Sequence, residues 1–331
     1  MMIDFKTKYL GLDLKSPLVV SASPLSEEVD RIARMEEYGA GAVVLFSLFE
    51  EQIRQENHAH DEVMASTNDA FAEASSYFPE AHEYSVGTET YLKLIEQAKQ
   101  KVDIPIIGSL NGITAEGWID FAQQIEQAGA DALELNIFYI PTELDVKGED
   151  VERRYIDILK TLKSKIQIPV AVKLSPYFSA MANMAHQLDE AGADALVLFN
   201  RFYQPDFDIE NFKVISSLRF SSSTEIRLPL LWISALCGRL KASLAATTGV
   251  QGPTEAIKYL LAGADVVMIT SALYRHGIPY LTHIAHGLES WMKNYQFDSV
   301  DQFRGILSQQ RVEDPTAFDR ANYIKILEAY K

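Results

Sequence analysis

The chain has 331 residues, of which 47% are hydrophobic; this content is sufficient for a large buried core and excludes a disordered chain. Its 46 acidic and 30 basic residues give a formal net charge of −16, which argues against nucleic acid or an anionic membrane as the main partner. Cys237 is the only cysteine, so the sequence excludes an intrachain disulfide and a zinc-ribbon pattern.

No segment has the length and apolarity of a membrane helix, and the N-terminal sequence MMIDFKTKYL lacks the apolar core of a signal peptide. We therefore expect a soluble, cytoplasmic protein that binds a small molecule and has neither nucleic acid nor membrane as a partner. An anionic ligand would need a local positive pocket in so acidic a chain. For the oligomeric state, a homodimer is the default expectation.

A short phrase recurs along the chain, as EYGAGAVVLF from residue 37, QAGADALELN from 127, EAGADALVLF from 190 and LAGADVVMIT from 261. In each copy a glycine follows a helical pattern, at the position where a helix commonly ends with positive φ, and an apolar run typical of a buried strand comes next. The four glycines are Gly39, Gly129, Gly192 and Gly263.

These phrases and four further apolar runs predict eight strands, at residues 18–23, 42–47, 104–110, 132–137, 169–174, 195–200, 243–248 and 266–271. Amphipathic helical patterns separate nearly all of them, and the helix before the seventh strand is expected to begin at Pro229 and to end at Gly238. Apolar strands that alternate with helices indicate a parallel sheet of the α/β class, covered on its outside. Eight such units predict a single (β/α)8 TIM barrel, with a doubly wound open sheet as the alternative.

The barrel is expected to span residues 1–296, and residues 297–331 are expected to form a helical extension packed on it. Two long insertions, at 48–88 and 201–228, exceed the usual length of a connection. Both leave from the carboxyl ends of predicted strands, which is the face where such barrels keep their sites. We interpret them as candidate lids, with oligomer contacts as the alternative.

The last two predicted strands end in small residues, in ATTGV from 246 and ITSAL from 269. Small residues leave backbone N–H groups free to converge on an anion, neighbouring hydroxyls add donors, and barrels often bind phosphate at this place. Tight turns that need small residues are the alternative. The candidate phosphate-binding residues are Thr248, Gly249, Val250, Thr270, Ser271 and Ala272.

Lys173 ends the fifth predicted strand, so its ammonium should project into the barrel mouth, where an unpaired charge would be costly. It could pair with a nearby carboxylate such as Glu134, provide a countercharge for an anionic cofactor, or act as a Schiff-base amine. Asn111, Asn136 and Asn200 end three other strands, and their amides could hydrogen-bond a flat heterocycle or stabilise turns.

The segment NHAHDE places His58 and His60 at a spacing that metal ligands use. They lie some ten residues past the second predicted strand, and no other strand end supplies a histidine or acid to complete three or four ligands. We therefore expect no metal site.

The segments PLVVSASP, IIGSLNG, LELNI, PVAVKLSPYF and TTGV, in this order, carry a resemblance to the dihydroorotate dehydrogenase family over roughly residues 4–295. This resemblance implies an FMN-containing barrel that oxidises dihydroorotate to orotate in pyrimidine biosynthesis, with hydride passing to the flavin. It implies that Ala22 and Ser23 lie against the flavin and that Lys173 faces its N1 and C2 oxygen edge. The three asparagines would line the ring or the substrate, and residues 248–250 and 270–272 would hold the phosphate.

The chain departs from the family pattern at several positions. Phe46 stands where the family usually has a second lysine, SSSTEIR replaces a glycine-rich loop, and Phe138 and Tyr139 stand where a Cys or Ser base is usual. Tyr139 is at about the base position, so it is a candidate acid or base, although a phenol with pKa ~10 would need strong depression to act near neutrality. The alternative is an aromatic wall.

The sequence thus favours an FMN-dependent oxidoreductase resembling dihydroorotate dehydrogenase, with a dihydroorotate-like substrate or another planar heterocycle. Two alternatives remain: a non-catalytic FMN- or phosphate-binding subunit that lost the base, and a Schiff-base lyase that uses Lys173.

Overall fold

The computed structural model describes residues 3–51, 53, 87–112, 119–201, 205–215, 218–318, 324, 327 and 328. Most of the candidate lid at 48–88, including His58 and His60, lies outside these residues.

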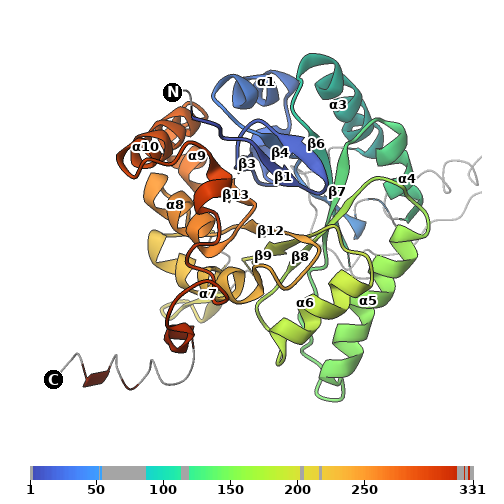
Figure 1. Ribbon diagram of the computed structural model, residues 1–331. Helices are drawn as coiled ribbons and strands as arrows, with labels where there is room; N and C mark the ends of the chain where they lie inside the picture. The colour runs from blue at the N-terminus through green and yellow to red at the C-terminus, as the bar shows by residue number, and fades with distance from the viewer. Residues whose placement is uncertain are drawn as a thin grey trace, which may run out of the picture.

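The centre of the molecule is a closed barrel of eight parallel strands in the order β4-β3-β13-β12-β9-β8-β7-β6, with a further pairing between β4 and β6 that joins the two ends (Figure 1). Across this seam Val43 pairs with Ile106. The prediction of a TIM barrel is therefore confirmed, and the open-sheet alternative is wrong. The strands are β3 (Leu18–Val20), β4 (Ala42–Val44), β6 (Ile106–Asn111), β7 (Ala132–Asn136), β8 (Val170–Leu174), β9 (Ala195–Leu198), β12 (Ser243–Ala246) and β13 (Val266–Ile269).

The recurring glycines end helices as expected. Gly39, Gly129, Gly192 and Gly263 have φ of +99°, +95°, +96° and +115°, values that residues with a side chain rarely adopt. Each is followed within three residues by a strand of the barrel, β4, β7, β9 or β13. The repeated phrase is therefore the helix-to-strand connection of the barrel.

Helices surround the strands (Figure 1). The helix before β12 begins at Arg227 rather than at Pro229, so the predicted start was two residues late; the proline still lies in the first turn, where its missing N–H costs nothing. The helices are α1 (Val29–Glu37), α3 (Thr88–Lys101), α4 (Ile119–Gln127), α5 (Gly148–Lys163), α6 (Met181–Glu190), α7 (Arg227–Leu236), α8 (Pro253–Ala262), α9 (Ser271–His276), α10 (Tyr280–Asn294) and α11 (Val300–Phe303), with 3-10 turns η1 (Pro24–Ser26), η2 (Ser223–Ile226) and η3 (Pro315–Phe318).

A hairpin of β1 (Thr7–Tyr9) and β2 (Leu12–Leu14) closes the amino-terminal end of the barrel. The Thr7 hydroxyl donates to the Asp265 carbonyl just before β13, and Tyr9 is fully buried in the cluster that fills the barrel interior. Because this end is filled by side chains, the space for a ligand is at the opposite, carboxyl end of the strands.

The chain after α10 returns to the barrel. Phe303 of α11 is fully buried, and Arg304 pairs with Asp265 at 2.5 Å and with Asp301 at 2.8 Å. These contacts attach the start of the predicted C-terminal extension to the amino-terminal end of β13.

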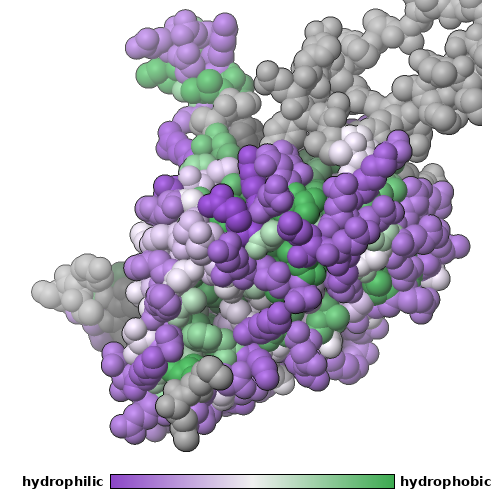
Figure 2. Space-filling model, turned by 90° about the horizontal axis from the view of Figure 1, so that it is seen from above, coloured by the Kyte–Doolittle hydropathy of each residue, from purple (hydrophilic) through white to green (hydrophobic). Residues whose placement is uncertain are grey.

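The insertion after β9 contributes a two-stranded hairpin, β10 (Asp206–Asp208) and β11 (Lys213–Ile215), and the turn η2. The face of the molecule in Figure 2 is mainly hydrophilic, with hydrophobic residues in small groups, as the high net charge leads one to expect. Among the described residues, none of the helices combines the length and apolarity that a membrane span requires.

Candidate active site

A cavity of about 420 Å³ lies at the carboxyl ends of the barrel strands. Its walls come from the segments that follow β3, β9, β12 and β13, from the end of β8 and from residues 218–221 of the insertion after β9. A second hollow of about 800 Å³ adjoins it and shares six of its lining residues. The shared residues are Phe199, Asn200, Arg201, Leu218, Arg219 and Thr248.

The cavity gathers nine of the twelve residues predicted to bind the cofactor, although they come from five different strands. They are Ala22, Ser23, Lys173, Asn200, Thr248, Gly249, Val250, Thr270 and Ser271. Asn111, Asn136 and Ala272 do not line it, and Ala272 is fully buried in the core.

Lys173 lines the cavity and is also paired with a protein acid, the alternative that the sequence left open. Its Nζ donates to Glu134 Oε1 at 3.1 Å, and the two side chains are only 10% and 1% exposed. An ammonium has three N–H donors, and this bond uses one of them. Lys173 therefore carries two further donors at the cavity wall, with no acceptor for them among the described residues.

The three asparagines form a connected row rather than three separate cavity walls. Asn136 lies between Asn111 and Lys173 in the strand register, and it accepts a 2.7 Å hydrogen bond from the Asn200 amide. Only Asn200 reaches the cavity. Asn136 thus holds the amide that a ligand would meet, and Asn111 lies one strand farther away.

The predicted phosphate loops meet through a residue that the sequence did not single out. Ser221 Oγ lies 2.9 Å from Ser271 Oγ and accepts the Gly249 N–H at 3.2 Å, so it bridges the loops after β12 and β13. A Cβ on Gly249 would lie 2.7 Å from Ile226 Cγ2 and 2.9 Å from the Ser222 carbonyl oxygen. The tight-turn explanation is therefore correct for Gly249, whatever else the loop does.

Two hydroxyls expected as phosphate donors have protein partners. Thr248 Oγ1 donates to the Phe199 carbonyl at 3.2 Å, and Thr270 Oγ1 to the Ser21 carbonyl at 3.4 Å. The N–H groups of Ser271 and Ala272 open α9, where a helix has no internal acceptor for them. The donors for an anion at this end are thus backbone groups more than side chains.

Tyr139 does not line either hollow. Its ring packs under the Arg154 guanidinium, 4.1 Å from the ring centroid, and its hydroxyl lies 3.4 Å from Glu143 Oε2. Phe138 lines the second hollow, and Phe46 is buried edge-on against Tyr91 with ring centroids 5.0 Å apart. The two aromatic positions that depart from the family pattern in the loop after β7 therefore point in different directions.

Two buried polar atoms near the cavity have no hydrogen-bond partner among the described residues: Ser23 Oγ and Glu134 Oε2. A buried hydroxyl without a partner is costly unless a ligand or water satisfies it. Ser23 lines the cavity and lies at a position implied to contact a flavin. The cavity also has a size usual for small-molecule sites. The residues present thus fit a cofactor with a polar ring edge and an anionic tail.

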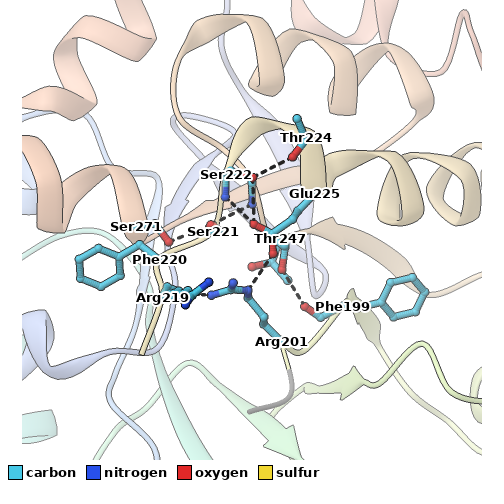
Figure 3. Close-up of polar contacts among 12 residues, drawn as sticks. Phe199, Arg201, Arg219, Phe220, Ser221, Ser222, Thr224, Glu225, Thr247 and Ser271 are labelled. Atoms are coloured by element: carbon cyan, nitrogen blue, oxygen red, sulfur yellow. Dashed lines mark hydrogen bonds and ion pairs between the residues drawn. The ribbon is translucent and has the colours of Figure 1, made fainter. Parts of the chain in front are cut away.

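Arg201 and Glu225 are further residues that the sequence analysis missed. They form a 2.9 Å ion pair beside the shared wall of the two hollows, and Ser222 forms a capping box with Glu225 at η2 (Figure 3). The S-x-x-E spacing from Ser222 to Glu225 was a readable signal for the turn. The turn lies in the candidate lid at 201–228, but the sequence did not indicate which residues of that insertion would reach the site.

Comparisons with known proteins point to one family. Residues 4–292 match the family model described as dihydroorotate dehydrogenase. A protein of Thermoplasma volcanium named dihydroorotate dehydrogenase B (NAD(+)), catalytic subunit, is 28% identical over 313 residues, which cover 92% of this chain and 99% of the relative. Proteins of the same name from Methanocaldococcus jannaschii and Pyrococcus furiosus are each 26% identical, covering 87% and 92% of this chain and 93% and 99% of the relatives.

Proposed function

Because the chain belongs to the dihydroorotate dehydrogenase family, we propose that it is an FMN-dependent oxidoreductase acting on a dihydroorotate-like substrate. The observation that carries the proposal is the cavity in which Lys173 and Asn200 face the loops after β12 and β13. A cation, an amide and a set of backbone donors around one cavity suit a flat heterocycle with a phosphate tail.

The residues that would hold the cofactor follow from the cavity wall. Ser23 would donate a hydrogen bond from its unpaired hydroxyl to the ring. The loops at 248–250 and 270–272 would hold the phosphate through backbone N–H groups other than that of Gly249, which donates to Ser221. When bound, FMN supplies a two-electron acceptor for hydride.

Lys173 would orient and stabilise charge at the ring edge with its two remaining N–H donors, while Glu134 fixes the ammonium in place. The pairing also bears on the Schiff-base alternative, because a nucleophilic amine needs a free lone pair and this amine donates to a carboxylate. We therefore rank the lyase function below the oxidoreductase function.

One observation favours a second candidate, the flavin-binding subunit without dehydrogenase activity. The oxidation of dihydroorotate needs a base that removes a proton as hydride leaves. The loop after β7 offers no thiol or aliphatic hydroxyl at 138–140, and the Tyr139 hydroxyl lies toward Glu143. The same observation also fits a dehydrogenase whose substrate differs from dihydroorotate.

The relatives are named NAD(+)-linked catalytic subunits, and we extend to this chain the expectation of a partner subunit. A cytoplasmic location, a role in pyrimidine biosynthesis and a homodimeric state are further parts of the proposal.

The visible spectrum tests the proposal. The purified or FMN-reconstituted protein should absorb in the flavin region, and anaerobic dihydroorotate should bleach it. A colourless protein after reconstitution would refute flavin binding. A yellow protein that dihydroorotate does not bleach would leave the binding function and remove the dehydrogenase function for that substrate. Lys173→Met should retain less flavin, whereas Lys93→Met, which alters an exposed lysine on α3, should not.

A further inference from the structure

The cation best placed to meet a ligand is Arg201, which directly follows the asparagine at the cavity wall. It lines both hollows, and its side chain is 39% exposed. It therefore lies on the wall that the two hollows share, with part of its side chain in solvent.

Arg201 is held in this position by two contacts. Its Nε donates to Glu225 Oε1 at 2.9 Å, and its Nη1 donates to the Arg219 carbonyl (Figure 3). Glu225 is itself fixed, because it accepts the Ser222 N–H at 2.6 Å. Burial alone would raise the pKa of Glu225, but the Ser222 bonds and the Arg201 charge outweigh it and lower that pKa, so the carboxylate stays ionised.

The two contacts leave most of the guanidinium unused. A guanidinium carries five N–H donors in one plane, and only two of them have acceptors among the described residues. The other three donors of this positioned group have no acceptor within the part of the chain that the structure describes. Such a planar fork matches a carboxylate with two parallel hydrogen bonds.

Other cations near the site are less available or less well placed. Lys173 donates to Glu134, and the proposed function assigns its two other donors to the cofactor ring. Arg219 is 80% exposed and pairs with Asp206 at 3.2 Å. Arg227 lines only the second hollow. The end of β4 offers a buried Phe46 in place of a cation.

We propose that Arg201 is the residue that selects a substrate with a carboxylate group, by binding that group at the junction of the two hollows. This inference rests on the proposed function, because that function supplies a ring substrate that reacts beside the bound cofactor. It adds the residue that binds the acid group of that substrate. The competing explanation is that Arg201 only ties Arg219 and Glu225 together.

The test uses calorimetric titration of the protein as purified with two probes, orotate and uracil, which share a ring and differ by the carboxylate. The variants are Arg201→Gln, Arg201→Lys and the control Arg31→Gln. Arg31 is a matched control because it pairs with Glu28 at 2.8 Å and is 42% exposed, on a helix outside both hollows. The flavin-to-protein ratio of each sample is measured first.

The wild type should bind orotate more tightly than uracil. Arg201→Gln should lower the affinity for orotate roughly ten- to a hundredfold, the loss expected for a charge-assisted hydrogen-bond pair. Its affinity for uracil should stay within about threefold of the wild-type value. The affinity of Arg201→Lys for orotate should lie between those of the wild type and Arg201→Gln, and Arg31→Gln should bind both probes as the wild type does.

If Arg201→Gln lowered the affinities for orotate and uracil equally, Arg201 would have a structural role and the proposal would be overturned. Unchanged orotate binding in this variant, or a wild type that does not prefer orotate, would also overturn it. The flavin ratio separates these outcomes from a failure of the proposed function. A protein that stays flavin-free after incubation with FMN and still shows the Arg201-dependent preference for orotate would retain this inference and refute the cofactor.

Discussion

Lys173 and Glu134 form a buried ion pair at 3.1 Å, in which the second carboxylate oxygen of Glu134 has no partner among the described residues. A buried ion pair adds little folding stability compared with apolar side chains of the same size. The removal of one member, however, leaves the other charge buried without compensation. The pair therefore fixes the ammonium at the cavity wall more than it stabilises the barrel.

This arrangement predicts a non-additive pair of substitutions. Glu134→Gln and Lys173→Met should each lower the free energy of unfolding by about 3 kcal/mol, and the double variant should lose less than the two losses added together. Urea denaturation of the four proteins checks this. The exposed pair Lys93 and Glu89, at 2.9 Å on α3, is the control. Its single variants should unfold at the same urea concentration as the wild type. Additive losses at 173 and 134 would contradict the coupling.

The loop after β12 predicts a steric effect that can be separated from backbone strain. Gly249 and Gly11 have similar φ, +79° and +74°, but a Cβ on Gly249 meets Ile226 and Ser222 within 3 Å, whereas one on Gly11 meets nothing within 4 Å. Gly11→Ala should cost ~1 kcal/mol for the backbone alone. Gly249→Ala should cost a further ~1–3 kcal/mol for the clash and retain less flavin. Equal melting shifts in the two variants would refute the close contact.

Much of the fold could be predicted because its signals are local. The glycine at each helix end, such as Gly129 with φ +95°, and the apolar run that follows it recur at every copy of the repeated phrase. Alternation of such units leaves few arrangements other than a barrel. The strand ends then bring Lys173, Asn200 and Thr248 to one cavity, because the carboxyl ends of parallel strands meet at one face.

The rest of the site could not be predicted because it depends on the path of a long insertion. Ser221 reaches the cavity through the path of the insertion and contacts Gly249, and Arg201, just after β9, is oriented by Glu225 from the same insertion. No periodicity encodes those contacts. Likewise, the direction of Tyr139 depends on an arginine of α5, which a sequence pattern in its own loop does not contain.

Ser23 predicts opposite effects with and without a ligand. Its buried hydroxyl has no partner among the described residues, so Ser23→Ala should leave the flavin-free protein as stable as the wild type or up to about 1 kcal/mol more stable. The same variant should bind FMN more weakly, because the hydroxyl would then be missing from the cavity wall. Thermal melts of flavin-free and FMN-loaded samples measure both. Equal FMN affinity in the two proteins would remove Ser23 from the site.

Glu225 predicts a dependence of stability on acid pH. Its pKa in the folded protein lies below the ordinary value of 4.5, since the Ser222 bonds and the Arg201 charge outweigh the effect of burial. An acid with a lowered folded pKa stabilises the protein above its unfolded pKa, and the contribution is lost as pH falls through the folded pKa. The difference in urea midpoint between the wild type and Glu225→Gln should thus shrink between about pH 5 and pH 3. A constant difference would contradict the ion pair.

Tyr139 provides the sharpest test of whether the loop after β7 supplies a base. Its ring lies 4.1 Å under Arg154 and its hydroxyl lies 3.4 Å from Glu143, away from both hollows. If the enzyme reduces its flavin with dihydroorotate, Tyr139→Phe should leave the anaerobic rate of flavin reduction within about twofold, because this hydroxyl does not line either hollow. Stopped-flow absorbance measures that rate, and Phe178→Leu, which alters an aromatic residue packed on Tyr155 of the same helix as Arg154, controls for packing. A loss of about a hundredfold or more in Tyr139→Phe alone would identify the phenol as the acid or base and would mean that the loop moves when substrate binds.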